Sequence, residues 1–157
     1  MRTLADLRAS HSAPGRLDWI GLRPSRGLPV VTCNRVRIET LGIEGDHYAG
    51  RDGGRAVTLL QAEYLPVIAS LCGRDRVPPE LLRRNLLISG INLSSLKNDP
   101  LRVGPVVLRI ISQCAPCSRM EDALGPGGYN AMRGHGGWYA CVLQPGEVTI
   151  GDPVLPA

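Results

Sequence analysis

Phenylalanine is absent from this 157-residue chain, and aromatic residues of all kinds make up only 4% of it. Hydrophobic residues nevertheless account for 43% and charged residues for 20%, which is typical of a globular chain rather than a disordered one. Leucine, valine and isoleucine must therefore fill the core. A chain of this length is expected to form one domain and to bury about two-thirds of its unfolded surface without disulfide bonds.

Long hydrophobic runs are also missing. No uncharged apolar stretch approaches the roughly 20 residues of a membrane-spanning helix. Arg2 and Arg8 are not followed by the apolar segment of a signal peptide. We therefore expect a cytoplasmic protein that makes no contact with membranes.

Lysine is nearly absent. Lys97 is the only lysine, so the positive side of the net charge of +4 comes from scattered arginines. No basic run is longer than the pair Arg83–Arg84, and the aromatic residues are too few to stack nucleic-acid bases. Guanidinium groups form planar, two-pronged hydrogen bonds to phosphate and carboxylate groups. The composition argues against a nucleic-acid partner and favours a small anionic ligand.

Five cysteines form an odd set in a chain without an export signal, so a disulfide framework is not expected. Buried, inert thiols are the simplest interpretation of Cys33, Cys72 and Cys141, which have apolar or β-branched neighbours. Cys114 and Cys117 differ, since the motif Cys-Ala-Pro-Cys lies between a predicted strand and a predicted helix.

Short β-like runs alternate with turn clusters from Arg16 onward. Residues 1–14 lack periodicity and are expected to form a flexible N-terminal arm, followed by a single domain over residues 15–157. The pattern predicts a mainly β fold, namely a mixed or antiparallel β-barrel with two to four short helices. Strands are expected at 18–22, 30–40, 56–60, 85–93, 103–112 and in a terminal hairpin of 137–143 with 147–155, and helices at 61–72, 78–82 and 117–124.

The Cys-Ala-Pro-Cys motif is the first candidate for chemistry. A helix N-terminus and the nearby Arg119 both favour a thiolate, which can attack an electrophile, bind a soft metal or carry sulfur. Structural zinc is improbable because the three histidines are scattered singles and four ligands are needed. A thioredoxin-like pair would suit the local pattern of strand, motif and helix, but not the glycines and hairpin that follow. The remaining interpretation makes one cysteine a soft-metal or sulfur ligand and the other a bystander.

Three further segments are candidates for a functional site. Glycines bracket His135, so the backbone from Gly134 to Gly136 could form a nest of N–H groups that Arg133 closes; an ordinary glycine-rich turn is the alternative. Arg83 and Arg84 precede a predicted strand, where adjacent side chains point in different directions, so only one is expected to face a site. Asp46, which follows Gly45, is the third candidate, and a tight turn capped by the Asp46 side chain is the alternative interpretation.

A series of motifs runs through the chain in this order: Gly-Ile-Glu-Gly-Asp at 42–46, Ala-Val-Thr-Leu at 56–59, Arg-Asn-Leu at 84–86, Cys117 with Arg119 and Glu121, Ala-Met-Arg-Gly-His-Gly-Gly-Trp-Tyr-Ala at 131–140, and Gly-Asp at 151–152. The series resembles the MOSC domain family, which is named after the C-terminal domain of molybdenum-cofactor sulfurases. The resemblance extends from about Arg16 to Val154, and its most specific parts are the cysteine-containing and glycine-rich segments.

The resemblance implies a β-rich barrel that binds the molybdenum cofactor (molybdopterin) or carries sulfur destined for it. It implies that Cys117 is the catalytic residue and the molybdenum ligand, while related members reduce N-hydroxylated compounds. The expected cofactor contacts are Arg84, Asn85, Arg133, Gly134, His135 and Gly136, and secondary candidates are Cys114, Arg119 and Asp46.

The resemblance also indicates which partner proteins this chain needs. We expect this chain to work without a fused desulfurase domain that binds pyridoxal phosphate (PLP) and without a fused ferredoxin module, so no PLP is expected. A separate protein must then supply sulfur or electrons. The preferred function is a molybdenum-dependent oxidoreductase or a sulfur carrier. The alternative is a non-catalytic module that binds or delivers the cofactor or another small anion, and the oligomeric state stays open.

Overall fold

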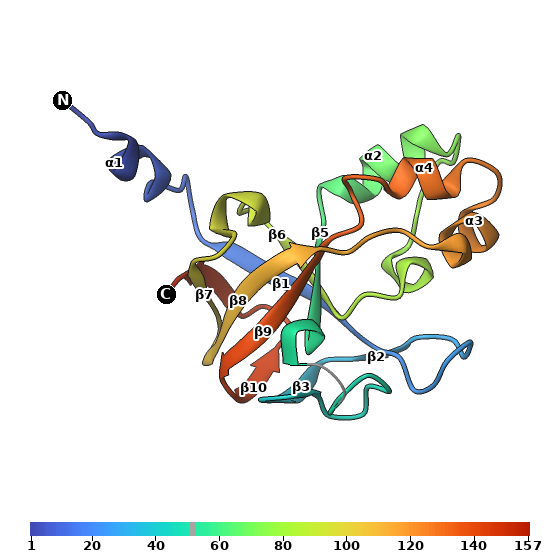
Figure 1. The fold of residues 1–157 in the computed structure, drawn as a ribbon, viewed down its shortest axis with the longest axis horizontal. Coiled ribbons are helices and arrows are strands. Elements are labelled where there is room, and N and C mark those ends of the chain that lie inside the picture. Colours follow the sequence, from blue (N-terminus) through green and yellow to red (C-terminus); the bar gives the residue numbers. More distant parts are fainter. Residues whose placement is uncertain (51–52) are drawn as a thin grey trace.

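Seven strands close into a barrel in a computed structural model that describes residues 1–50 and 53–157 (Figure 1). Around the barrel the order is β1-β11-β7-β8-β9-β5-β6, and β6 pairs with β1 again. Neighbours are antiparallel except for the parallel pair β5–β6. The predicted mixed β-barrel is confirmed. The strands are β1 (Gly15–Leu22), β5 (Val57–Gln61), β6 (Leu86–Ser89), β7 (Pro100–Val103), β8 (Val106–Gln113), β9 (Trp138–Gln144) and β11 (Pro153–Pro156).

A second, small sheet lies beside the barrel and consists of β10 (Gly146–Thr149), β3 (Arg35–Glu39) and β4 (Gly42–Ile43). Strand β2 (Val31–Cys33) extends the barrel sheet next to β1. The single strand predicted over residues 30–40 is therefore two strands. The chain turns at Asn34, and the two halves pair in different sheets.

Short helices gather on one side of the barrel, at the upper right of Figure 1. These are α2 (Tyr64–Leu71), α3 (Ser118–Leu124), α4 (Gly128–Met132) and the 3-10 helix η2 (Pro79–Leu82). Helix α4 contacts both α2 and α3, and α3 contacts η2. Pro66 lies in the first turn of α2, and Gly73 follows its end with a positive φ of 65°, as the sequence predicts. The remaining short helices are α1 (Leu4–Arg8), η1 (Gly53–Arg55) and η3 (Leu93–Leu96).

Helix α1 lies within residues 1–14, away from the barrel in Figure 1, where the sequence pattern predicts no helix. Thr3 accepts a hydrogen bond from the Asp6 backbone N–H, and the Asp6 carboxylate accepts one from the Thr3 backbone N–H, which together stabilise the helix start. The interpretation of this segment as a flexible arm stays a prediction. Among the described residues, no helix combines the length and apolarity needed to cross a bilayer.

Two hydrophobic clusters fill the structure, and leucine, isoleucine and valine dominate the larger one inside the barrel. The second cluster lies between the helices and the outer face of β5 and β6, where Leu60 and Leu87 meet Ile68, Met120 and Met132. Strand β5 is buried at every position because the barrel covers one face and the helices cover the other. The second cluster therefore fixes the helices against this side of the barrel.

The predicted C-terminal hairpin is wrong. Strand β9 pairs with β8 and β5, β10 pairs with β3, and β11 pairs with β7 and β1. Gly151 has a positive φ of 97° and divides the predicted strand 147–155 into β10 and β11. The alternating pattern on both sides of Pro145-Gly146 was compatible with a hairpin, but each strand buries its apolar face against a different partner.

Candidate functional site

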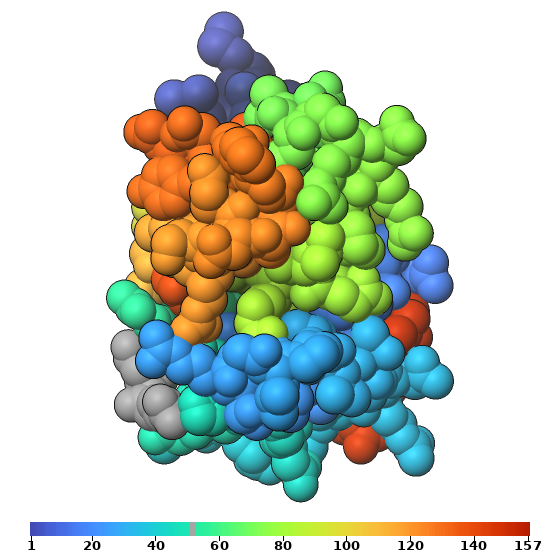
Figure 2. All heavy atoms as spheres, turned by 90° about the vertical axis from the view of Figure 1, so that its right-hand side faces the viewer, coloured from blue at the N-terminus to red at the C-terminus, as the bar shows by residue number. Residues whose placement is uncertain are grey.

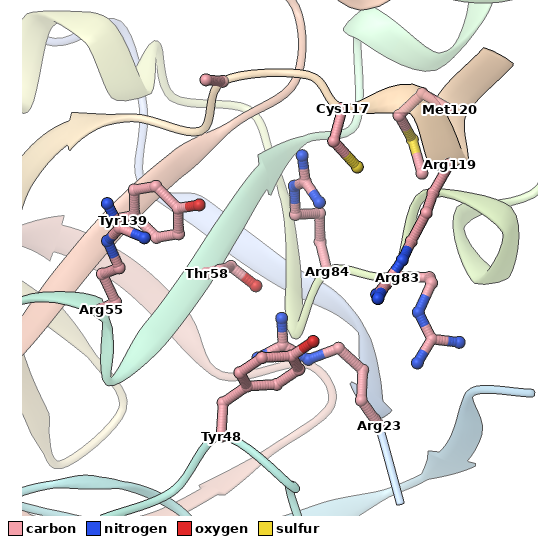
Figure 3. A pocket seen from close by; sticks show the side chains of 11 residues that line it. Arg23, Tyr48, Arg55, Thr58, Arg83, Arg84, Cys117, Arg119, Met120 and Tyr139 are labelled. Atoms are coloured by element: carbon pink, nitrogen blue, oxygen red, sulfur yellow. The ribbon is translucent and has the colours of Figure 1, made fainter. Parts of the chain in front are cut away.

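A cavity of about 320 Å³ lies between the barrel and the helices, and the residues around it come from separate parts of the chain. Figure 2 faces the side where the helical segments, orange and green, meet the segment after β1, blue. Figure 3 shows the side chains from close by. The lining residues are Arg23, Tyr48, Arg55, Thr58, Arg83, Arg84, Ala115, Cys117, Arg119, Met120 and Tyr139.

Positive charge dominates this cavity, since five of its lining residues are arginines and none of the described lining residues is acidic. Arg23 is paired with a carboxylate, that of Asp46. Arg83, Arg84 and Arg119 form no ion pair with any residue in 1–50 or 53–157. Because arginine remains protonated at all physiological pH values, the cavity carries an excess of positive charge and is suited to an anion.

Arg23 is 8% exposed and belongs to a buried hydrogen-bond network. Its Nε and Nη2 donate to the two carboxylate oxygens of Asp46 at 3.0 and 2.8 Å. Asn85, fully buried, donates to Asp46 Oδ1 and to the Gly21 carbonyl, and its Oδ1 accepts from the backbone and side chain of Thr58. Asp46 and Asn85 therefore lie behind the cavity wall and hold Arg23 in place.

The charge state of Asp46 follows from this network. Burial by itself raises the pKa of the carboxyl group, but the hydrogen bonds and charge of Arg23, helped by Asn85, outweigh it, so that the net pKa lies below the usual value. Asp46 is consequently ionised at neutral pH. It neutralises Arg23, whereas Arg83, Arg84 and Arg119 have no ion-pair partner among the described residues.

Both Arg83 and Arg84 line the cavity, although the sequence predicts that only one of them would face a site. Arg83 has a left-handed backbone (φ 55°, ψ 44°) at the end of η2, which breaks the alternation expected for an extended segment. Its guanidinium donates to the carbonyl oxygens of Ser25 and Leu28, in the segment after β1. A left-handed conformation in a non-glycine residue is uncommon and here brings two cations to one cavity.

Arg84 is held by main-chain carbonyls rather than by an acid. Its Nε donates to the Gly136 carbonyl at 2.7 Å, and its Nη1 donates to the Leu82 carbonyl at 2.9 Å. In Figure 3 its guanidinium extends toward Cys117. The hydrogen bonds fix the orientation of the side chain without neutralising its charge.

The two cysteines of the Cys-Ala-Pro-Cys motif have different surroundings. Cys117 is exposed, is the N-cap residue of α3 and lines the cavity. Cys114 is 4% exposed, and burial raises the pKa of its thiol despite the opposing charge of Arg84. After Cys114 the chain enters α3 and α4, and β9 then returns antiparallel to β8, so the motif does not open a thioredoxin-type βαβ unit. The accessible thiol is that of Cys117.

The three remaining cysteines are half-buried rather than buried, which corrects the expectation for Cys33, Cys72 and Cys141. Cys33 and Cys141 lie on strands whose outer faces meet solvent in part, and Cys72 ends α2. None of them lines the cavity as far as the structure describes it.

The glycine-rich segment contributes packing and one carbonyl to the site. A Cβ at Gly137 would lie 2.1 Å from the Leu59 carbonyl oxygen, so only glycine fits there. His135 places Nδ1 at 3.0 Å from the Ala131 carbonyl oxygen and meets Tyr64 edge-on. Arg133 and Gly134 are exposed, and neither they nor His135 are among the described residues that line the cavity. Their role as cofactor contacts stays a prediction, and Gly136 reaches the site through its bond to Arg84.

Sequence reasoning missed several lining residues. Arg23 lies 4.3 Å from the ring centre of Tyr48, and Arg55 lies 4.9 Å from that of Tyr139, which gives two cation–aromatic pairs in the wall. The preference for arginine over lysine was the one signal in the sequence. No local motif marks Arg23, because its place in the cavity depends on the buried Asp46.

The residues available to a metal are few. Within 1–50 and 53–157 no group of three or more His, Cys, Asp or Glu side chains is arranged to hold a metal ion. The cavity instead offers one exposed thiol, from Cys117, together with guanidinium groups for an anionic ligand. Such a set suits a metal that arrives already bound to an anionic organic cofactor and accepts one further soft ligand.

Comparison with known proteins agrees with the motif order. The profile of the MOSC domain matches residues 43–155. Among solved structures, YuaD from Bacillus subtilis is 20% identical with a TM-score of 0.80, over 90% of this chain and 94% of that one. YiiM from Escherichia coli is 20% identical with a TM-score of 0.69, over 90% and 69%. YiiM from Geobacillus stearothermophilus is 18% identical with a TM-score of 0.72, over 92% and 75%.

At these identities the similar structures demonstrate a shared fold, and a search of curated proteins gives no significant match. The profile match covers more than half of the sequence and includes the Cys-Ala-Pro-Cys motif and the glycine-rich segment. The chain belongs to the MOSC domain family.

Proposed function

We propose that this protein binds the molybdenum cofactor in the arginine-lined cavity, with Cys117 as the protein ligand of molybdenum. MOSC domains are associated with that cofactor. The observation that carries the proposal is the presence of one exposed thiol and five arginines, without a lining carboxylate among the described residues, in a single cavity. The protein acts either as an oxidoreductase on N-hydroxylated compounds or as a sulfur carrier.

The size and the charge of the cavity support the proposal. Its volume of about 320 Å³ lies at the lower end of the ~300–1,000 Å³ of small-molecule sites. The phosphate monoester of the cofactor carries about two negative charges and accepts several hydrogen bonds, and arginine guanidinium groups suit both properties. Arg84 is oriented by two carbonyls and Arg23 by Asp46, so both are positioned before a ligand arrives.

Cys117 supplies the soft ligand. A thiolate binds molybdenum more readily than an oxygen or nitrogen donor does. Cys117 lies at the start of α3, lines the cavity together with Arg119, and is exposed, so its sulfur is accessible to a ligand in the cavity. Cys114 is buried behind it and acts as a packing residue in this proposal.

The roles of the chain's own residues follow from these positions. The bound cofactor would supply two-electron redox chemistry. Arg84 and Arg119 hold anionic groups, Asp46 and Asn85 keep Arg23 in place, and Cys117 anchors the metal. In this proposal a separate protein delivers electrons to the oxidoreductase or sulfur to the carrier.

Purification from a host that synthesises the cofactor tests the proposal. Molybdenum is measured by elemental analysis and pterin by fluorescence after oxidative release. The wild-type protein should retain both, Cys117→Ser should retain pterin but lose molybdenum, and Arg84→Gln should lose both. Arg102→Gln, on the exposed face of β7, is the matched control and should retain both. Folded wild-type protein with neither pterin nor molybdenum would refute the proposal.

The same preparation distinguishes the oxidoreductase from the sulfur carrier. Reduction of an N-hydroxylated test compound by loaded protein and a chemical reductant supports the oxidoreductase. Absence of molybdenum from protein that retains pterin supports the sulfur carrier.

A non-catalytic binding module is the second candidate, because the cations of the cavity come mostly from segments other than α3 and need no thiol. Full reductase or sulfur-transfer activity in Cys117→Ser would remove the catalytic role of the thiol and leave this module as the function. Complete loss of activity, with pterin retained, would exclude it.

A further inference from the structure

We infer that Cys117 takes sulfur directly from a small dianion of the thiosulfate class, held by Arg83, Arg84 and Arg119. The inference deepens the proposed function, since it rests on the same cavity and names a substrate for the sulfur-carrier form. It adds an activity that needs neither the cofactor nor a donor protein.

The charges of the cavity match such a reaction. A thiolate and a thiosulfate dianion together carry three negative charges and repel each other in water. Three arginines of the cavity lack a carboxylate partner among the described residues, namely Arg83, Arg84 and Arg119. Their three positive charges allow the two anions to approach. The guanidinium of Arg119, which forms no hydrogen bond among the described residues, can bind two oxygens of a tetrahedral sulfonate group.

The arginines also lie close to one another and to the thiol. The positive charges of Arg23 and Arg119 contribute to a lowered pKa of Arg83, after burial as the main cause. The Arg119 side chain forms no hydrogen bond or ion pair within 1–50 and 53–157. In Figure 3, Arg84 extends toward the sulfur of Cys117, and Arg119 and Arg83 are drawn on the same side of the cavity. A bound dianion would relieve the repulsion among these groups.

The reaction balances without an external oxidant. The Cys117 thiolate attacks the outer sulfur of thiosulfate and forms a new sulfur–sulfur bond. The bond between that sulfur and the sulfonate sulfur breaks, and its electron pair leaves with sulfite, whose charge the arginines stabilise. A persulfide anion remains on Cys117, and a nucleophile such as cyanide can remove the outer sulfur as thiocyanate and restore the thiolate.

The test uses the full chain, reduced and free of cofactor, with thiosulfate as the sulfur donor. Mass spectrometry should find one added sulfur atom on the peptide that contains Cys117, sulfite should appear in equal amount, and added cyanide should release thiocyanate. Cys117→Ser should abolish all three signals, whereas Cys114→Ser should retain them. A persulfide on another cysteine, or none at all, would overturn the inference.

A neutral reagent separates the role of charge from general thiol reactivity. Methyl methanethiosulfonate reacts with the same thiolate but carries no charge. Arg119→Gln should slow the thiosulfate reaction about tenfold, equivalent to ~1.4 kcal/mol, and change the neutral reaction far less, while Arg119→Lys should recover part of the rate. Arg102→Gln is the control and should leave both rates unchanged. Equal slowing of both reactions by Arg119→Gln would refute anion binding by the arginines.

The outcome is separable from that of the cofactor experiment. Protein that retains molybdenum and pterin but forms no persulfide from thiosulfate would overturn this inference and leave the proposed function intact. Protein that forms the persulfide but retains neither component would support the inference and refute cofactor binding.

Discussion

Replacing Asp46 by asparagine would remove the charge that holds Arg23 in the cavity wall. Asp46 is 6% exposed and Arg23 is 8% exposed, so the ion pair between them, at 2.8 Å, is shielded from solvent. Asparagine is nearly the same size and keeps one oxygen acceptor, but it leaves a guanidinium charge without a partner in a buried position. The expected effect is therefore electrostatic and not a change in packing.

The size of the effect follows from what breaking a buried ion pair costs. Removing one partner of such a pair typically destabilises a protein by about 3–5 kcal/mol, because the remaining charge stays buried. Arg23 also faces the cavity and hydrogen-bonds to Asn85, so the lower value is appropriate. We expect a loss of ~3 kcal/mol, and for a domain of this size about 2–4 °C of melting temperature per kcal/mol, which is roughly 6–12 °C.

Urea denaturation and thermal melting at pH 7 measure this loss, and Glu39→Gln is the matched control. Glu39 pairs with Arg37 at 2.7 Å, but both side chains are about half exposed (56% and 46%). Exposed pairs contribute only about 0–1 kcal/mol, so the control should lose far less. If Asp46→Asn lost no more stability than Glu39→Gln, the buried network would not hold Arg23 as the structure indicates.

The pH dependence gives an independent check. The pKa of Asp46 is lower in the folded protein than its ordinary value, so the ionised form stabilises the fold. This stabilisation is complete above the unfolded-state pKa of about 3.9 and is lost as the pH falls through the lower folded-state pKa. The difference in stability between wild type and Asp46→Asn should stay constant from pH 7 to about pH 5 and shrink below about pH 4.

Three further outcomes are expected. In metal-free protein at neutral pH, iodoacetamide should label exposed Cys117 well before Cys114, since burial raises the pKa of the Cys114 thiol; the reverse order, read by peptide mass spectrometry, would contradict the assignment. Gly137→Ala should cost ~2 kcal/mol more in urea denaturation than Gly134→Ala, because both have positive φ but only at Gly137 would a Cβ strike a carbonyl oxygen. Phosphate should raise the melting temperature of wild type more than that of Arg119→Gln, and an equal rise would argue against an anion at Arg119.

Several features of the fold could be predicted from local sequence. The lack of phenylalanine implied an aliphatic core, and the barrel is filled mainly by leucine, isoleucine and valine. Short alternating runs implied strands, and Pro66 and Gly73 marked the start and end of α2. These features depend on residue types and short spacings, which the sequence contains directly. The order of the motifs was likewise sufficient to identify the MOSC family.

The pairing of strands could not be predicted in the same way. Residues 137–155 satisfied the local rules of a hairpin, yet β9, β10 and β11 all pair elsewhere. Partner choice depends on which buried surface each strand covers, and that surface is built by segments distant in sequence. The division of residues 30–40 between two sheets has the same cause.

The candidate site shows the same division at the level of single residues. Cys117, Arg84 and Arg119 carry a recognisable local pattern, and the sequence by itself marked them as candidates. Arg23 has no such pattern, because a carboxylate 23 positions away orients its side chain. Arg83 faces the cavity through a left-handed backbone that residue type alone does not indicate. Sequence determines which groups are present and their local preferences, whereas only the tertiary structure brings distant charges together, because burial and pairing energies depend on all the surrounding segments at once.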